Sequence, residues 1–359
     1  MANSKRIESL DIAKGFGILI VVLGHVLRPN DVFLKEFIFS FHMPLFFILS
    51  GFVLKTENVK GKAFLGSELK LLSSYIIYGL LYLFINVPLG VVTKSFGIWD
   101  AFMAFYQLLV LYGRGPLWFL TALMFAHIGC KILKRYFNDN WALIVGLLLL
   151  LLSEVIRAVI KPMETAGIWQ ILYYPMETFF RGFGYTFFCM AGYCFKKQFF
   201  KISREIEENK INIKLIGVCI LMTCMILVNV LCVKSFYAYD TYTLADVNVN
   251  DLIYAIFRII MGITGSISVL GISLLLTKWK LTIKVFTYFG INSLFIMATH
   301  LQFYICAVAR KITGMTVNSL FVSFLIVVAI EVVLITILNR PLKYFTDKIS
   351  NALKKLLNL

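Results

Sequence analysis

His25 and Lys14 are the residues of this chain whose types and spacing best fit chemistry inside a membrane-spanning helix. Both lie in the first hydrophobic run, from Ile12 to Leu27, where polar side chains are costly and tend to serve a function. They are eleven residues apart, so at about 100° per residue they are offset by only about 20° around a helix. At about 1.5 Å per residue they lie about 16 Å apart along its axis. One helix face therefore carries a cation near one membrane surface and an acid–base group deep in the membrane or toward the other surface.

Other polar residues occur in the first two hydrophobic runs. Asp11 shares the face of Lys14 and His25. His42 lies two residues before Pro44, and Ser50 follows in the same run. A proline inside a helix frees backbone carbonyls and kinks the helix. Kinked helices line cavities or serve packing alone, and both interpretations stay open for this run.

Further candidates are scattered along the chain. Trp118 follows Gly115-Pro116 and needs a partner for its indole N–H. Arg181 stands four residues after Glu177, so this pair is either functional or a structural ion pair. Asn292 and Ser293 precede His300 by about two helical turns and share its face, so we expect all three to meet the His25 helix in one polar core. His127, by contrast, is interpreted as a hydrogen-bonding residue between helices.

The composition indicates a polytopic helical membrane protein. Of the 359 residues, 60% are hydrophobic and 15% are charged, against about 25% charged in soluble domains. The hydrophobic residues cluster in runs near the length that crosses about 30 Å of hydrocarbon. The net charge of +16 is explained by cytoplasmic lysines and arginines beside anionic lipid headgroups, so we expect no nucleic-acid partner.

The hydropathy pattern predicts about ten transmembrane helices in a single membrane domain, residues 1–359, with a C-terminal cytoplasmic tail at about 340–359. The predicted spans are 10–28, 37–54, 71–92, 116–134, 141–160, 176–195, 213–233, 251–277, 285–307 and 318–339. Residues 101–113 form a shorter apolar stretch that is re-entrant or interfacial. With both termini in the cytoplasm, 24 of the 35 lysines and arginines fall on the cytoplasmic side, as the positive-inside rule requires.

Three segments outside the spans have their own patterns. Residues 195–214 mix basic, acidic and aromatic residues and predict an amphipathic helix on the inner membrane surface, and 344–359 are similar. Residues 234–251 are rich in tyrosine and aspartate. That pattern suits either a sugar ligand or an ordinary aromatic belt at the membrane surface.

These motifs together resemble those of the acyltransferase 3 family of membrane acyltransferases, in particular its fucose acetylase-like and polysaccharide O-acetyltransferase members. The similarity covers essentially the whole chain. It is strongest from Arg6 through Lys14 to His25 and in the run from Phe41 to Phe52. The Trp118-Phe119-Leu120 segment and the segment from Gly290 to His300 support it. Many members have arginine where this chain has Lys14.

The resemblance implies ten transmembrane helices, acetyl-CoA or another acyl-CoA as cytoplasmic cosubstrate, and a carbohydrate hydroxyl as acceptor on the far side of the cell membrane. By the same resemblance His25 is the essential histidine and Lys14 the essential basic residue. Many members carry an arginine pair after the second helix, where this chain has lysines, including Lys62 and Lys70. Lysine binds phosphate as a point charge, so we expect Lys14, Lys62 and Lys70 to contact CoA.

Acyl transfer from a thioester requires a base and a group that stabilises an oxyanion. Because a thioester is already activated, no metal and no tightly bound cofactor are expected. His25 either deprotonates the acceptor or carries the acyl group itself. Supporting roles are assigned to a wider set of residues: Asp11, His42, Ser50, Trp118, Arg181, Asn292, Ser293 and His300.

Two other functions fit a polytopic protein with polar residues in the membrane. The first is a transporter or flippase for a lipid-linked sugar, although such proteins usually show internal repeats. The second is a non-catalytic subunit or receptor, which leaves the alignment of Lys14 and His25 unexplained. The acceptor glycan, the acyl group and the oligomeric state stay open.

Overall fold

The computed structural model describes residues 8–27, 31–55, 65–94, 97–165, 167–207, 212–242, 250–301, 303–316 and 319–357. Within these ranges, only the backbone is described at 212–215, 235–242, 250–255 and 315–316. The described residues form helices joined by short connections and include no strand. The α-helices are α1 Glu8–Val26, α2 Val32–Val53, α3 Gly66–Val92, α4 Ile98–Leu109, α5 Trp118–Tyr136, α6 Asp139–Ile160, α7 Gln170–Gly184, α8 Thr186–Glu207, α9 Asn212–Tyr242, α10 Asn250–Leu276, α11 Lys280–Ile291, α12 Ser293–Thr299, α13 Ile305–Thr316 and α14 Leu320–Leu356.

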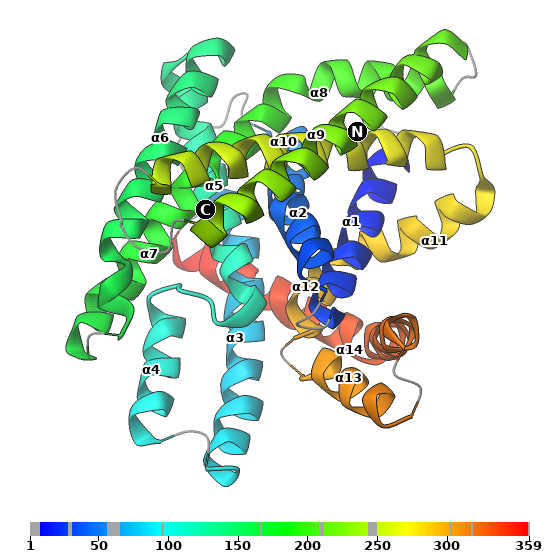
Figure 1. Ribbon diagram of the computed structural model, residues 1–359. Coiled ribbons are helices and arrows are strands. Elements are labelled where there is room, and N and C mark those ends of the chain that lie inside the picture. The colour runs from blue at the N-terminus through cyan, green and yellow to red at the C-terminus, as the bar shows by residue number, and fades with distance from the viewer. Residues whose placement is uncertain are drawn as a thin grey trace. The chain divides into compact units, whose positions relative to one another are not determined.

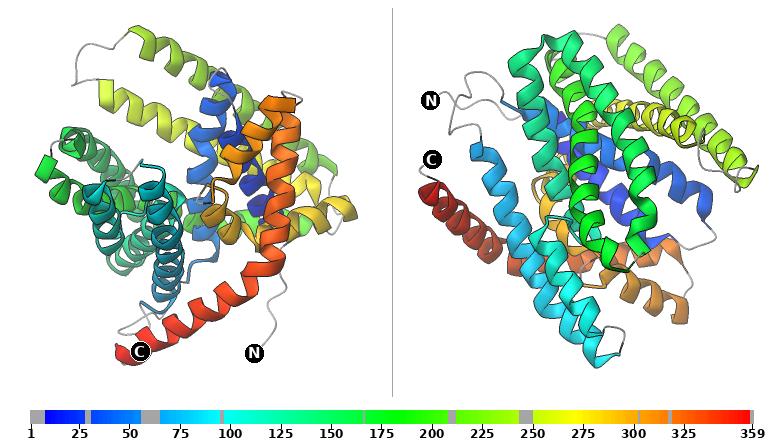
Figure 2. Two further views of the ribbon diagram at one scale, coloured as in Figure 1. Left: turned by 90° about the horizontal axis from the view of Figure 1, so that it is seen from below. Right: turned by 90° about the vertical axis from the view of Figure 1, so that its left-hand side faces the viewer.

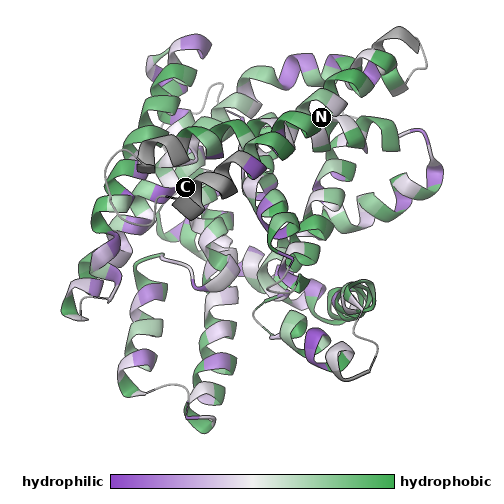
Figure 3. Ribbon diagram, in the orientation of Figure 1, coloured by the Kyte–Doolittle hydropathy of each residue, from purple (hydrophilic) through white to green (hydrophobic). Residues whose placement is uncertain are grey.

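The all-helical membrane fold predicted from the sequence is confirmed. Eight helices within the described residues are long and apolar enough to cross a membrane, and α11 with α12, bent by 57°, makes a ninth if the pair is one span. Figure 3 shows that hydrophobic residues cover most of the helical ribbons. Side chains in the spanning segment of α9 are mostly exposed, as expected for a helix that faces lipid rather than a protein core.

Two of the ten predicted spans differ from the structure. The predicted span 176–195 is divided between α7, which ends at Gly184, and α8, which begins at Thr186. The residues on both sides of the break are similarly apolar, so hydropathy alone does not reveal where α7 ends and α8 begins. The predicted span 285–307 comprises the bent pair α11 and α12, a turn, and the start of α13.

The segments predicted to lie outside the spans are mostly helical where they are described, although 110–113 follow the end of α4 without helical structure. Helix α4 has 12 residues, too few to cross a bilayer, in agreement with the prediction for 101–113. The predicted surface helix at 195–214 is part of α8. Its apolar side packs on protein, because Phe199 stacks on Phe52 of α2 with ring centroids 4.9 Å apart and Ile206 is buried. The tail at 340–359 continues α14 as far as Leu356.

The chain divides into two compact units, each described here by itself. Unit 1 comprises Met1–Val53, Ala191–Ile296 and Cys306–Val328. In it, α1 packs against α2, α10 and α11, and α9 lies beside α10 (Figures 1 and 2). The backbones of α1 and α11 touch. A Cβ atom on Gly15 would clash with the carbonyl oxygen of Phe286, and one on Gly290 would clash with that of Asp11.

Unit 2 comprises Leu54–Met190, Met297–Ile305 and Ala329–Leu359. Helices α3 and α4 lie side by side, and α7 packs between α5 and α6. Gly182 of α7 lies against Phe125 of α5. Met103 of α4, Ile160 of α6, and Tyr173 and Tyr174 of α7 form a buried cluster. The prediction of a single membrane domain for the whole chain stays a prediction.

Candidate functional site

Helix α1 carries the two residues on which the sequence analysis depends. It is unbroken from Glu8 to Val26, so the shared face of Lys14 and His25 and their separation of about 16 Å follow from helix geometry. Both residues are half-buried, whereas Asp11 is buried. The helix thus presents a cation and an imidazole on one face within a packed unit.

His25 lies against Phe39 of α2, and Phe39 also contacts His42. The ring centroids of His25 and Phe39 are 5.0 Å apart, and those of Phe39 and His42 are also 5.0 Å apart. Gly24 permits this arrangement, because a Cβ atom there would come within 2.6 Å of Cε1 of Phe39. The structure therefore brings His25 and the predicted supporting residue His42 to one aromatic ring, which shields part of each imidazole from water.

Asn292 and Ser293 lie toward the other end of α1. Asn292 follows Gly290 by two residues, and Gly290 lies against the carbonyl of Asp11. His25 is 14 residues further along α1, about 21 Å away along the axis. The polar core expected with Ser293 and His300 stays a prediction. Asn292 itself adjoins α1, the His25 helix, at its Lys14 end and not at His25. The packing of α11 decides this, and it cannot be read from the spacing of Asn292, Ser293 and His300.

Two of the predicted supporting residues have local backbone contacts. The hydroxyl of Ser50 donates a hydrogen bond to the carbonyl oxygen of Phe47, 2.7 Å away in the same helix. The side-chain amide of Asn292 donates to the carbonyl oxygen of Tyr288 at 2.8 Å. Asn292 is thus bonded to the last turn of α11, and Ser293 begins α12 after the 57° bend. The observed bond of Asn292 stabilises the point at which this span is broken.

In unit 2 the structure brings together Trp118 and Arg181. The guanidinium of Arg181 lies 4.9 Å from the ring centroid of Trp118 and 5.1 Å from that of Tyr112. It also donates a hydrogen bond of 2.7 Å to the carbonyl oxygen of Tyr112. Burial raises the pKa of the Tyr112 phenol above its usual value, and the nearby arginine only partly offsets this. The phenol is therefore neutral at physiological pH.

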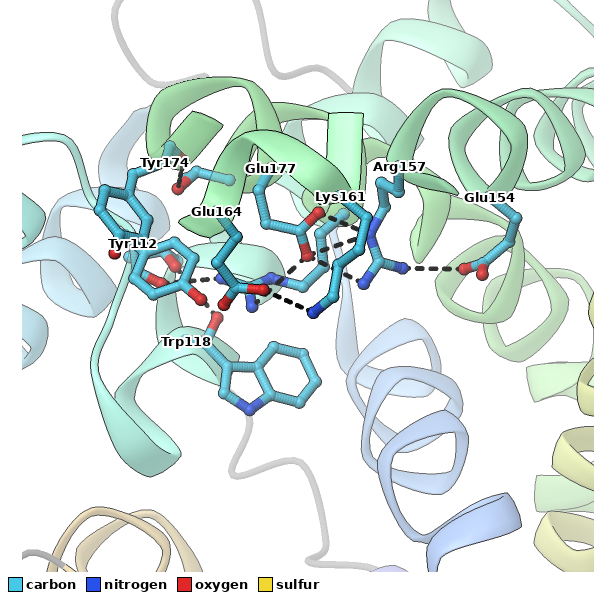
Figure 4. A network of polar contacts seen from close by, with 11 residues as sticks. Tyr112, Trp118, Glu154, Arg157, Lys161, Glu164, Tyr174 and Glu177 are labelled. Carbon is cyan, nitrogen blue, oxygen red and sulfur yellow. Dashed lines mark hydrogen bonds and ion pairs between the residues drawn. The ribbon is translucent and has the colours of Figure 1, made fainter. Parts of the chain in front are cut away.

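Glu177 is held mainly by Arg157 of α6, a residue that the sequence analysis did not select. Arg157 donates through Nε to both carboxylate oxygens of Glu177, at 3.0 and 2.9 Å, and also contacts Glu154 at 2.9 Å. Figure 4 shows Arg157 between the two carboxylates. The predicted pair of Arg181 and Glu177 is more distant, at 3.8 Å. Arg157 lies inside the predicted span 141–160, and a charged residue in a hydrophobic run is the sequence signal that would have identified it.

His300 is fully buried in unit 2. The residue before it, Thr299, donates a hydrogen bond of 2.8 Å to Glu331 of α14, which the sequence analysis also did not select. The structure places His300 in unit 2 and His25 in unit 1, so their expected meeting stays a prediction.

The lysines expected to contact CoA have different surroundings. Lys70 is exposed and pairs with Asp347 of α14 at 3.1 Å, whereas Lys62 lies outside the described residues. A third lysine, Lys131 of α5, is buried and pairs with Glu68 at 2.8 Å. Nδ1 of His127 of α5 lies 3.6 Å from the same carboxylate of α3, longer than an ordinary hydrogen bond, so the predicted hydrogen bond of His127 between helices stays a prediction.

Neither the tyrosine- and aspartate-rich segment nor any cluster of metal-ligating side chains gives a site in the described residues. The side chains at 235–251, part of the tyrosine- and aspartate-rich segment, lie outside them. Among the described residues, no group of three or more His, Cys, Asp or Glu side chains is arranged to hold a metal ion.

Comparison with known proteins identifies a family. The family model Acyl_transf_3, described as an acyltransferase domain, matches residues 7–340. No curated protein and no solved structure matches the chain. The matched range includes Lys14, His25 and every other predicted site residue.

Proposed function

The chain belongs to the acyltransferase 3 family of membrane acyltransferases, and from that premise we propose that it is an O-acyltransferase of the cell membrane. It transfers an acyl group, by preference acetyl, from cytoplasmic acyl-CoA to a carbohydrate hydroxyl on the extracytoplasmic side. Both termini are cytoplasmic in this proposal. The observation that carries it is α1, one unbroken helix with Lys14 and His25 on one face.

Lys14 is proposed to bind the donor. CoA carries several phosphate charges, and a lysine ammonium binds phosphate as a point charge. Asn292, at the same end of α1 as Lys14, is a further polar group for the donor. Lys62 and Lys70 follow the second span in sequence and are proposed to add positive charge on the cytoplasmic side.

His25 is proposed to carry the chemistry, by one of two routes. In the first, an imidazole nitrogen removes the proton of the acceptor hydroxyl while its oxygen attacks the thioester carbonyl. The C–S bond then breaks, and the proton passes to the departing CoA thiolate. In the second, the imidazole attacks the thioester and releases CoA, and the acyl-imidazole then passes its acyl group to the hydroxyl. Both routes give one ester and one free thiol.

His42, which contacts the same Phe39 ring as His25, is proposed to assist His25. Trp118 and Arg181 are proposed to contribute to acceptor recognition, because an aromatic face beside a fixed cation suits a polyhydroxylated ligand. Asp11, Ser50, Ser293 and His300 keep supporting roles in the proposal, without a specific step.

The proposal is tested with purified protein by measuring release of the CoA thiol from acetyl-CoA in the presence of a glycan acceptor. We expect His25→Ala to abolish release while the protein still inserts and unfolds at a normal temperature. His127→Asn is the matched control, since it changes another intramembrane histidine that faces a structural ion pair. We expect it to lower the unfolding temperature more than the turnover. Near-normal turnover in His25→Ala would refute the assignment.

Labelled acetyl-CoA without acceptor separates the two routes. A labelled protein adduct that is absent from His25→Ala supports the acyl-imidazole, whereas no adduct in an active protein supports the general base. A transporter or flippase would consume no acyl-CoA at all.

A further inference from the structure

Glu331 is the one ionisable side chain between Leu320 and Asn339 of α14. It stands eleven residues after the start of the helix, about 17 Å along its axis. This depth is near the middle of about 30 Å of hydrocarbon. Only 2% of Glu331 is exposed, so the carboxyl group points into protein and not into lipid.

The carboxyl group accepts a hydrogen bond from the last residue of α12. The hydroxyl of Thr299 donates to Oε2 of Glu331 at 2.8 Å. Thr299 is the last residue of α12, and the fully buried His300 follows it. The bond joins two side chains, so Glu331 holds the Thr299 side chain at the point where α12 ends.

Glu331 differs from two other buried carboxyl groups of unit 2, Glu68 and Glu177, each of which has a cationic partner. Among the described residues, no ion pair includes Glu331, and its Oε1 is buried without a hydrogen-bond partner. Glu68, equally buried at 2%, has Lys131 at 2.8 Å, and Glu177 has Arg157 at 2.8 Å. An ionised carboxylate without a cation is strongly disfavoured in such surroundings.

We propose that Glu331 is a proton-holding site within the membrane, a neutral carboxylic acid that fixes the end of α12 through Thr299. Its ligand is the proton. In the acyl transfer proposed above, Glu331 is a positioning residue that acts through Thr299 and His300. The proton-holding site itself does not depend on the proposed function.

A hydrophobic carbodiimide tests the site directly in the full-length protein in membranes. Dicyclohexylcarbodiimide reacts with protonated carboxyl groups in apolar surroundings. The acid O–H adds across one C=N bond, and the adduct rearranges to a stable N-acylurea without losing any atom. We expect peptide mass spectrometry to find one added carbodiimide on Glu331 and none on Glu68, the matched carboxylate with a lysine partner. Labelling of Glu68 but not Glu331, or of neither, would overturn the proposal.

Variants of the hydrogen bond test the positioning role. Glu331→Gln keeps a neutral acceptor for the Thr299 hydroxyl, so we expect it to retain at least half of the turnover. Glu331→Leu and Thr299→Val remove the bond, and we expect each to lower kcat at least tenfold while the KM for acetyl-CoA changes less than twofold. Thr299→Ser restores the hydroxyl and should rescue activity.

The control is Ser323→Ala, which removes another buried hydroxyl contact of α14, the one with Thr313, and should leave turnover unchanged. A Glu331→Gln variant as inactive as Glu331→Leu would refute the positioning role, because it would mean that the proton must leave. If the wild-type protein transfers no acyl group, the carbodiimide result still decides whether Glu331 holds a proton. The two failures are therefore distinguishable.

Discussion

Phe39 determines what the two histidines of unit 1 can do for each other. Its ring contacts both His25 and His42 at 5.0 Å, so the imidazoles share an apolar neighbour. An aromatic wall limits the directions from which water and substrate reach each ring. In the proposed reaction, the thioester and the hydroxyl therefore approach His25 from a side that Phe39 does not cover.

Lys14 gives the prediction that belongs to the residue scale. If it binds CoA phosphate, Lys14→Ala removes a charge-assisted contact worth about 1.5–3 kcal/mol. We therefore expect the KM for acetyl-CoA to rise about 10- to 100-fold with a smaller change in kcat. Lys14→Arg, which keeps the charge, should stay within a few-fold of the wild type in both constants. Steady-state kinetics on purified protein measures this, and an unchanged KM with a collapsed kcat would assign Lys14 to the chemical step.

The contact between helices α1 and α11 positions Asn292 at the Lys14 end of α1, where the acyl-CoA donor is proposed to bind. Gly15 and Gly290 let the two backbones touch, as small residues do in membrane helix pairs. Because these contacts involve backbone carbonyls, they cannot yield by rotating a side chain. The position of Asn292 beside the Lys14 end therefore depends on two missing methyl groups.

Gly290→Ala tests this contact. The added methyl group meets the carbonyl oxygen of Asp11, so we expect a loss of about 1–3 kcal/mol in stability and a higher KM for acetyl-CoA. Thermal unfolding in detergent and steady-state kinetics measure the two effects. Gly217→Ala in α9 is the control, because a Cβ atom there meets nothing within 4 Å, and we expect it to leave both quantities near the wild type. Equal unfolding temperatures for the two variants would contradict the close approach.

The sequence was most informative where the deciding property is local. Hydropathy placed α1, α2, α3, α5 and α6 because a run of apolar residues needs no distant partner to be recognised. It missed the break at Tyr185, which follows glycines that pack on other helices. Arg157 and Glu331 were visible as charges inside hydrophobic runs. Their partners stand 20 and 32 residues away, and such pairings come from tertiary packing that no spacing rule supplies.

At the scale of the whole molecule, the number of crossings determines on which side each terminus lies. If α11 and α12 cross together, the described residues hold nine candidate spans, and an odd number of crossings would put the two ends of the chain on opposite sides. The distribution of lysine and arginine instead predicts both ends in the cytoplasm. The two are reconciled if the segment from α7 to α8 also crosses. Helix α7 has 15 residues, too few to cross alone, so the crossing would have to use both helices.

Cysteine accessibility distinguishes these topologies. In a variant without the seven native cysteines, single cysteines are placed at the exposed positions Ile168, Lys201 and Asn351 and treated with a membrane-impermeant maleimide. If α7 and α8 together cross, Ile168→Cys is labelled in intact cells, whereas Lys201→Cys and Asn351→Cys are labelled only after permeabilisation. Labelling of both Ile168→Cys and Lys201→Cys in intact cells would keep α7 and α8 on one side. It would also place the basic residues of α8 opposite to the positive-inside rule, and the proposed cytoplasmic C-terminus would then require one crossing fewer elsewhere in the chain.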